Sequence, residues 1–275
     1  MKLVSDNIFV ETGFRGSNDS FVVTSDGIVM IDTPYQPTDA IRWRDVVTSH
    51  GNIRYVINTS PHLDHCLGNF FFPGQVIAYK GTRDVLLTVN MNQIRANIQR
   101  FIPGGFPLPD KYEIKLPDIT FTQQLDLYLG NHTFQLIHLP GHTRNEIGVY
   151  VPEEKVIFTG DNVQCKVQTF LQQSDPDKWL ESLQRIDELE VDVVVPGHGQ
   201  ICDKSYIKEQ ALFIQEWMDT VQEAIRRGLD KEEAQNEISF ADRYPMEPGA
   251  EALLYEMQKW NVARLYDYFS SKTKK

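Results

Sequence analysis

Ser60-Pro61-His62-Leu63-Asp64-His65 is a stretch with two histidines and one aspartate close together. The chain has only 7 histidines among its 275 residues, so this density is far above background. Imidazole and carboxylate are ligands that zinc, iron and manganese accept. The stretch therefore predicts a metal-binding loop.

Three further candidate ligands lie downstream, each after an apolar stretch that reads as a short buried strand. Loops that leave strands in this way carry functional side chains on a rigid scaffold. We therefore expect the three to converge with the first loop. The motifs are Leu139-Pro140-Gly141-His142, Phe158-Thr159-Gly160-Asp161 and Val195-Pro196-Gly197-His198.

The order and context of these motifs resemble the metallo-β-lactamase superfamily of hydrolases, from about residue 8 to residue 202. The signature of that family is His-x-His-x-Asp-His, followed by separate His, Asp and His ligands. Ser60 departs from the signature, because it stands where the first histidine is expected. Six residues match the signature one by one: His62, Asp64, His65, His142, Asp161 and His198.

The resemblance implies an α/β fold, the four-layer αββα sandwich of this family, with two adjacent metal sites. His62 and His142 would hold the first metal, with Ser60 in the position of a third imidazole. The second metal would be held by Asp64, His65 and His198, and Asp161 would bridge the two. An aspartate at position 161 is more similar to the glyoxalase II, lactonase and phosphodiesterase branches than to typical β-lactamases.

Ser60 leaves three alternatives open. A neutral hydroxyl is a poorer ligand for a divalent metal than imidazole or a carboxylate. The first site would hold its metal weakly, with Ser60 as a weak ligand or water anchor, or only the second site would be filled, or the chain would bind no metal. Because six ligands are retained, we expect one or two zinc ions, with iron or manganese as alternatives.

Composition narrows the class of partner. The net charge of −11 and the pI near 5.1 argue against a nucleic acid, which requires clustered Lys and Arg. The N-terminus lacks the apolar core of a signal peptide, and no apolar run is long enough to span a bilayer. We therefore expect a small-molecule substrate, no membrane contact and a cytoplasmic location; the oligomeric state is left open.

Strands and helices alternate along the first 202 residues, which indicates an α/β layer structure. We predict a catalytic domain at 1–202 and a helical extension at 203–275, whose aromatic residues Phe213, Trp217, Trp260, Tyr266 and Phe269 are expected core contacts. Residues 91–118 interrupt the alternation with a short amphipathic helix and a Pro-, Gly- and Phe-rich segment, predicted as a lid insertion or else an ordinary surface insertion. Strands are expected at 119–129, 133–139, 146–151, 155–159 and 191–195, and helices at 177–189, 205–228 and 252–269.

A bound metal lowers the pKa of its water to about 7 and polarises the bond to be cleaved. Asp64 is the expected catalytic residue, since it is placed to accept the proton of that water. Asp32 is expected either to fix the tautomer of a metal-binding histidine, by accepting a hydrogen bond from its other ring nitrogen, or to be a plain turn aspartate. Candidate substrate contacts are Arg15, Arg144 and Asn162, with Asn145 and Glu146 nearby.

Three cysteines, Cys66, Cys165 and Cys202, each lie close to a motif, and we expect reduced, packed thiols or, alternatively, one metal ligand or redox-sensitive neighbour. The leading function is a zinc-dependent hydrolase of a small ester, lactone, thioester or amide. The alternatives are a β-lactamase-type amide hydrolase, a non-haem iron oxidoreductase on the same fold, and a metal-poor binding protein.

Overall fold

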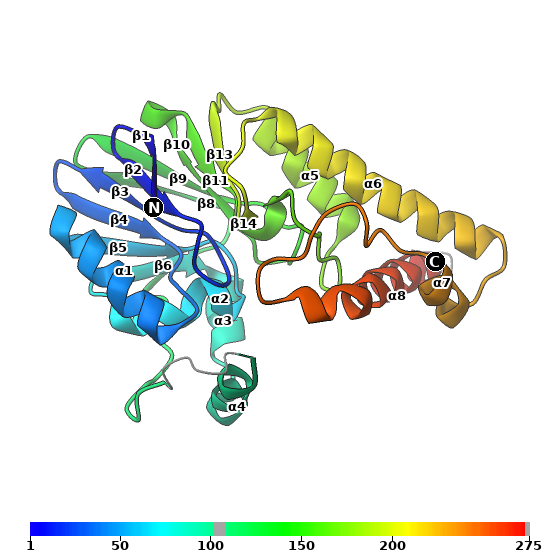
Figure 1. Cartoon of the computed structure of the whole chain (residues 1–275). Helices are drawn as coiled ribbons and strands as arrows, with labels where there is room; N and C mark the ends of the chain where they lie inside the picture. The colour runs from blue at the N-terminus through cyan, green and yellow to red at the C-terminus, as the bar shows by residue number, and fades with distance from the viewer. Residues whose placement is uncertain (102–107, 273–275) are drawn as a thin grey trace.

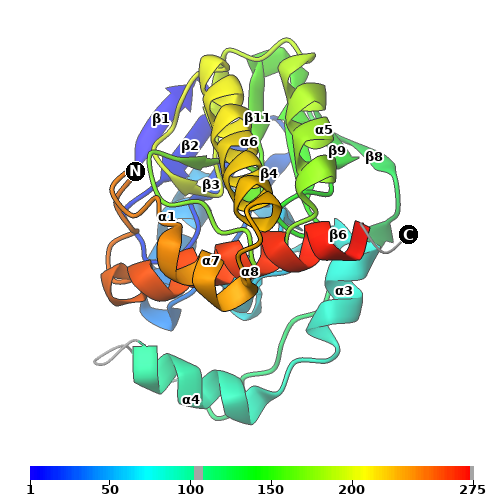
Figure 2. The ribbon, with the colours of Figure 1, turned by 90° about the vertical axis from the view of Figure 1, so that its right-hand side faces the viewer.

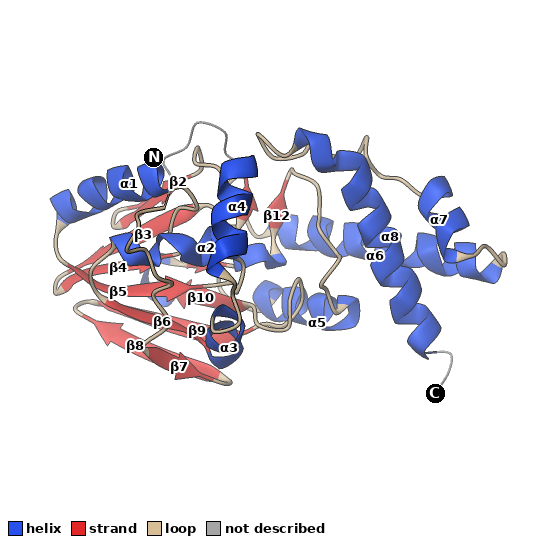
Figure 3. Cartoon of the chain, turned by 90° about the horizontal axis from the view of Figure 1, so that it is seen from below, coloured by secondary structure: helices blue, strands red, loops and turns tan. Residues whose placement is uncertain are grey.

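The computed structural model describes residues 1–101 and 108–272. Two β-sheets lie face to face, and helices cover the outer face of each, which confirms the predicted αββα sandwich. The sheets are at the left of Figure 1 and helices α5 to α8 are at the right. Figure 3 shows the same separation from below, with the strands grouped on one side.

The first sheet has seven strands in the order β1-β2-β3-β4-β5-β6-β7. Neighbours from β1 to β4 are antiparallel, and neighbours from β4 to β7 are parallel. The strands are β1 (Lys2–Ser5), β2 (Ile8–Glu11), β3 (Asp19–Thr24), β4 (Gly27–Ile31), β5 (Ile53–Asn58), β6 (Gln75–Tyr79) and β7 (Ile119–Phe121).

The second sheet has the order β13-β11-β10-β9-β8, and β12 and β14 form a separate pair. β9 and β11 both run antiparallel to β10, while β11 and β13 are parallel, so β9, β11 and β13 end at the same edge. The strands are β8 (Gln124–Leu129), β9 (His132–His138), β10 (Ile147–Val151), β11 (Val156–Phe158), β12 (Gln164–Cys165), β13 (Val193–Val195) and β14 (His198–Gly199).

The described residues contain eight α-helices, and none of these combines the length and the apolar content needed to cross a membrane. Short 3-10 turns lie at Leu67–Phe71, Pro152–Glu154, Gly160–Asn162 and Glu251–Leu253. The α-helices are α1 (Pro37–His50), α2 (Leu63–Cys66), α3 (Lys80–Leu86), α4 (Met91–Phe101), α5 (Pro176–Asp187), α6 (Ser205–Arg226), α7 (Lys231–Glu237) and α8 (Leu254–Lys272).

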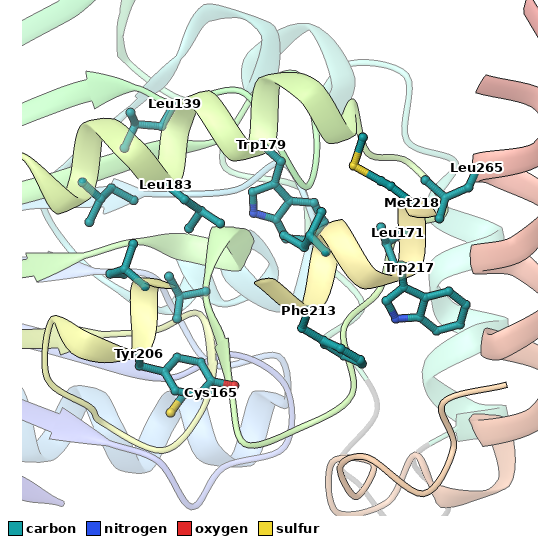
Figure 4. Packing of buried hydrophobic residues seen from close by; sticks show 14 of the residues in the cluster. Leu139, Cys165, Leu171, Trp179, Leu183, Tyr206, Phe213, Trp217, Met218 and Leu265 are labelled. Carbon is teal, nitrogen blue, oxygen red and sulfur yellow. The ribbon is translucent and has the colours of Figure 1, made fainter. Parts of the chain in front are cut away.

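Three apolar layers hold the sandwich together. Helix α1 buries Ala40, Trp43 and Val47, which recur at helical spacing, against the outer face of the first sheet. A second layer fills the space between the sheets, and strands with one face on it alternate in burial, as β9 does. The third layer packs α5, α6 and α8 on the second sheet, and Figure 4 shows Trp179 and Trp217 inside it.

The C-terminal helices share this third layer with the second sheet, and α8 runs across α5 and α6 in Figure 2. The boundary at residue 202 stays a prediction. Among the predicted core aromatics, Phe213, Trp217 and Phe269 are buried, and Tyr266 packs against them. Trp260 is 40% exposed, so its assignment to the core was wrong. The buried residues of α8 include Met257, Asn261, Leu265 and Phe269, which recur every four residues, and Trp260 lies outside this stripe.

Two further expectations differ from the structure. Residues 119–129 were expected as one strand, but β7 belongs to the first sheet and β8 to the second, with a turn between them. Helix α7 was missed although Asp230 and Glu233 form a capping box at its start. In both cases, the apolar pattern is too short to fix the element by itself.

Candidate metal centre

Asp161 is the centre of the candidate site and is 1% exposed. Its Oδ1 lies 2.9 Å from His65 Nε2 and 3.0 Å from His198 Nε2. Its Oδ2 lies 2.9 Å from His62 Nδ1 and 3.7 Å from His142 Nε2. One carboxylate therefore faces two imidazoles with each of its oxygens.

The ligand atoms form two groups, each with its members within 4.8 Å of one another. The first ligand group is His62, His142 and Asp161, and the second ligand group is Asp64, His65 and His198. Imidazole nitrogens and carboxylate oxygens at such distances suit a divalent ion such as zinc. The structure thus brings together all six residues predicted from the sequence, in the two groups that the resemblance implied.

Asp32 lies behind the second ligand group. Its Oδ2 is 2.9 Å from Nδ1 of His65, the nitrogen that points away from Asp161. Oδ1 accepts a hydrogen bond from the Thr59 backbone N–H at 2.8 Å, which fixes the carboxylate. The Asp32 backbone has a φ of 59°, a left-handed conformation that aspartate tolerates better than most residues. This geometry is that of a carboxylate that orients a metal-binding histidine.

The charges in the site are arranged around an anion. Burial by itself raises the pKa of Asp161, but the charges of His65 and neighbouring imidazoles hold that pKa well below its usual range. Burial lowers the pKa of His62, yet its hydrogen bond to Asp161 and the negative charges around it together outweigh this and raise the pKa to about 9. Burial lowers the pKa of His142 to about 3, which keeps its imidazole neutral. The Asp161 anion among imidazoles also suits a divalent cation, because a bound metal takes the place of the protons on these imidazoles.

Ser60 is completely buried beside the first ligand group. Its Oγ lies 2.9 Å from Glu146 Oε1 and 3.1 Å from Asp161 Oδ2. Glu146 is also completely buried, and burial, together with the nearby Asp161 charge, raises its pKa to about 8. The suggestion that Glu146 contacts a substrate was therefore wrong, because no surface of its side chain reaches the cavity described below.

Glu247 is a site residue that the sequence analysis missed. It lies in the loop between α7 and α8, and its Oε1 is 2.5 Å from Nδ1 of His198. Burial lowers the pKa of His198, but the charges of Glu247 and Asp161 hold it well above its usual range. The helical extension thus supplies a carboxylate to the second ligand group. No motif surrounds this residue, so only the folded chain reveals its role.

Replacing Glu247 by glutamine is expected to weaken the second metal site by about 10- to 100-fold, the usual effect of losing a carboxylate behind a metal-binding histidine. Competition with a chromophoric zinc chelator measures this affinity. Glu256→Gln, an exposed change in the nearby α8, is the matched control and should bind as the unmodified chain does. Equal affinities for all three proteins would contradict this role for Glu247.

The short segment 16–18, just before β3, forms hydrogen bonds to two of the segments that carry the ligands. Ser17 Oγ donates to the Asp64 carbonyl at 2.7 Å, and Asn18 Nδ2 donates to the Pro196 carbonyl at 2.9 Å. Gly16 has a φ of 98°, and a Cβ on it would lie 2.9 Å from Cβ of Asp64. Only glycine fits there, because the backbone approaches the ligand loop closely.

Gly16→Ala should destabilise the fold by about 1–3 kcal/mol and displace Asp64, since it combines left-handed strain with a steric clash. Thermal unfolding and zinc stoichiometry measure the two effects. Gly228→Ala is the matched control: its φ is 84°, but a Cβ there meets nothing within 4 Å. The control should lose stability from strain alone and keep its metal; a Gly16→Ala protein that also keeps its metal would contradict the role given to this segment.

A cavity of about 480 Å³ opens onto the ligands, a volume in the range of small-molecule sites. His62, Asp64, His142, Asp161 and His198 line it. Its remaining wall is mixed, with apolar or aromatic side chains and a few polar ones. The wall residues include Arg15, Tyr35, Leu63, Phe170, Gln172 and Gln173.

The three predicted substrate contacts occupy different places. Arg15 lines this cavity, and its guanidinium also donates to the Gly249 carbonyl at 2.9 Å. Arg144 lines a neighbouring cavity on the other side of His62. Asn162 is completely buried: its Oδ1 accepts from the His142 N–H, and its Nδ2 donates to the Leu139 carbonyl. This burial does not agree with a substrate contact and makes Asn162 a support for the His142 turn.

All three cysteines are free, and none belongs to either ligand group among the described residues. In the predicted lid, 102–107 lie outside the described residues. Tyr112 donates to the Leu67 carbonyl at 2.6 Å and, with Ile94 and Leu108, packs on the 3-10 turn after α2. The described part of 91–118 does not line the cavity at the ligands. The loop between α7 and α8, which carries Glu247, does line this cavity, so part of the cavity wall comes from the helical extension.

A model of the metallo-beta-lactamase superfamily matches residues 12–198, more than half of the chain and a span that includes both ligand groups. This chain belongs to the metallo-β-lactamase superfamily. The resemblance identified from the motifs is therefore confirmed.

Its curated relatives include two kinds of hydrolase. Hydroxyacylglutathione hydrolase GloC of Haemophilus influenzae is 35% identical over 116 residues, which cover 40% of this chain and 50% of that protein. The linear primary-alkylsulfatase of a Pseudomonas species is 31% identical over 90 residues, or 30% of this chain and 17% of that protein. The chain thus matches half or less of the length of these relatives. The first of them agrees with the predicted glyoxalase II-like branch.

Solved structures share the fold over nearly the whole chain. The sec-alkylsulfatase Pisa1 from a Pseudomonas species superimposes with a TM-score of 0.74 at 15% identity, covering 97% of this chain and 49% of that chain. An archaeal superfamily protein from Sulfolobus tokodaii gives a TM-score of 0.64 at 19% identity, covering 95% of this chain and 98% of that one. At these identities the likeness concerns the fold alone.

Proposed function

We propose that this chain is a zinc-dependent hydrolase that cleaves a small ester, lactone, thioester or amide. One observation carries the proposal. Two groups of imidazole and carboxylate ligands line one small-molecule cavity, and Asp161 of the first group also faces the imidazoles of the second. A site that only stabilised the fold would be closed, whereas catalytic metal sites keep an open side toward substrate.

Zinc is the favoured metal because the ligand set is rich in imidazole, with four imidazoles and two carboxylates. When bound, the metal activates a water for attack and polarises the scissile bond. The protein supplies the geometry. Asp161 faces both ligand groups, and Asp32 and Glu247 hold the outer nitrogens of His65 and His198.

Asp64 is the proposed catalytic residue. Its side chain is 27% exposed and lines the cavity, and its Oδ2 lies 3.5 Å from His198 Nε2. Asp161, in contrast, is almost completely buried among imidazoles. Asp64 is therefore the carboxylate that can reach the attacking water and hold its proton until the leaving group departs.

The cavity wall favours a substrate with an apolar portion and a polar end. Tyr35, Leu63 and Phe170 provide the apolar surface, and Gln172 and Gln173 provide amide groups. The hydroxyacylglutathione hydrolase relatives are named for an acyl substrate, which supports carbonyl chemistry here. We therefore place thioesters and esters first among the candidate substrates.

The test is a substrate panel on protein with measured metal content. We expect a thioester, ester or lactone to be hydrolysed, the activity to vanish when the metal is removed by a chelator, and zinc to restore it. Hydrolysis that survives metal removal would contradict the proposal. Bound iron together with oxygen consumption would favour the oxidoreductase alternative. Faster hydrolysis of β-lactams than of any other substrate in the panel would favour the β-lactamase-type alternative.

A second candidate is hydrolysis of an alkyl sulfate ester. The sequence match to the linear primary-alkylsulfatase supports it, as does Arg15 in the cavity wall, since a guanidinium recognises an anionic group well. A medium-chain alkyl sulfate in the same panel separates the two candidates. Release of sulfate without cleavage of any carbonyl substrate would select this one.

A further inference from the structure

Two histidines of the second ligand group, His65 and His198, have a carboxylate behind their outer nitrogen. Such a carboxylate orients a metal ligand and makes it a better donor. Ser60 has the same kind of partner, because Glu146 Oε1 accepts a hydrogen bond from its Oγ at 2.9 Å. The residue that departs from the family signature thus shares a feature with the ligands that match it.

Ser60 Oγ also lies among the atoms of the first ligand group. It is 3.1 Å from Asp161 Oδ2, and that same oxygen is 2.9 Å from His62 Nδ1. A hydroxyl has one hydrogen and two lone pairs. When the hydrogen is donated to Glu146 and one lone pair accepts the His62 backbone N–H at 3.4 Å, the other lone pair is left for an ion held by His62 and Asp161.

One oxygen of Glu146 is left without a partner. The side chain is completely buried, and its Oε1 accepts hydrogen bonds from the hydroxyls of Ser60 and Thr143. Its Oε2 has no hydrogen-bond partner within the described parts of the chain. Leaving a buried polar oxygen unpartnered is costly, and native proteins keep such an arrangement mainly where a site uses the side chain. This arrangement therefore indicates that Glu146 acts in the site, through Ser60.

We propose that Ser60 and Glu146 together replace the missing imidazole of the first metal site. Ser60 Oγ is the ligand. Glu146 is a positioning residue: it accepts the Ser60 hydrogen and so leaves a lone pair of Oγ directed at the ion. This inference rests on the proposed metal-dependent function. It gives the first site a complete set of ligands, whereas one alternative from the sequence was a first site that binds its metal weakly.

The experiment measures zinc affinity, so it is independent of substrate. The variants are Glu146→Gln, Ser60→Ala and the double variant, and binding is followed by competition with a chromophoric chelator. Each single change should weaken the first site by about 10- to 100-fold and leave the second unchanged. The double variant should bind no more weakly than Ser60→Ala, because the two residues act in series. Cobalt(II) in place of zinc should show an altered visible spectrum in Ser60→Ala, since one ligand is lost.

Glu154→Gln is the matched control, because Glu154 contacts a histidine, His132, away from both ligand groups. It should bind zinc as the unmodified chain does. Glu146→Gln with two unchanged affinities would overturn the inference. The inference would also be overturned if Glu146→Gln weakened both metal sites and lowered the melting temperature of the metal-free protein. That pattern would indicate that Glu146 supports the fold and not the first metal site. In either case, two zinc ions on the unmodified chain would leave the hydrolase proposal standing.

Discussion

Replacing Asp161 by asparagine is expected to lower kcat/KM by about 1,000-fold or more, since a metal site contributes several kcal/mol of transition-state stabilisation. The amide has nearly the shape of the carboxylate but no charge. It can no longer face the imidazoles of His62, His65 and His198 as an anion. Zinc content should fall from two ions per chain to one or fewer.

Elemental analysis and steady-state hydrolysis on the same preparation measure both effects. Asp192→Asn is the matched control, because Asp192 is exposed and lies only a few residues before His198. The control should keep its metal and its activity. An Asp161→Asn protein that retains two zinc ions would show that this carboxylate is not shared between the ligand groups.

The largest effect on stability is expected at Trp179. This side chain is completely buried between α5 and the second sheet, where its Nε1 donates to the Asn162 carbonyl at 2.9 Å. Its ring lies 5.4 Å from that of His142. Trp179→Ala should therefore lower the free energy of unfolding by about 3–5 kcal/mol, the range for a buried tryptophan. It should also weaken the first metal site, because the His142 turn loses its support.

Chemical denaturation of the metal-free protein measures the first effect without interference from bound zinc. Trp260→Ala is the matched control, since Trp260 is 40% exposed on α8. It should lower the unfolding free energy by clearly less, about 1–2 kcal/mol, since much of its ring is already in water. Equal losses for the two tryptophans would contradict the packing described for the third layer.

The fold and the two ligand groups were predictable because their signals are local. His142, Asp161 and His198 each follow a short apolar strand and a Pro-Gly or Gly turn, and the second sheet places the ends of these strands together. His62 is the N-cap of the one-turn helix α2, which contains Asp64 and His65, so their proximity follows from spacing alone. Asp32 was within reach of the same reasoning, because it directly follows β4, which pairs with the strand that carries this loop.

The supporting carboxylates Glu146 and Glu247 were not predictable in these roles. Glu146 follows His142 closely, but nothing in the sequence shows that its side chain turns inward to Ser60. Glu247 reaches His198 only because α6, α7 and α8 pack on the second sheet and return the chain to the cavity. Such contacts depend on tertiary packing, which hydrophobic periodicity does not encode at the level of single side chains.

The proposed two-metal centre is best tested by the metal content per chain. Protein purified without chelators or a metal-affinity tag would be analysed for all transition metals by elemental mass spectrometry, before and after incubation with zinc. We expect close to two zinc ions per chain, one for each ligand group. A folded chain that contains no metal and takes up none from added zinc would show that the two ligand groups do not form a metal centre.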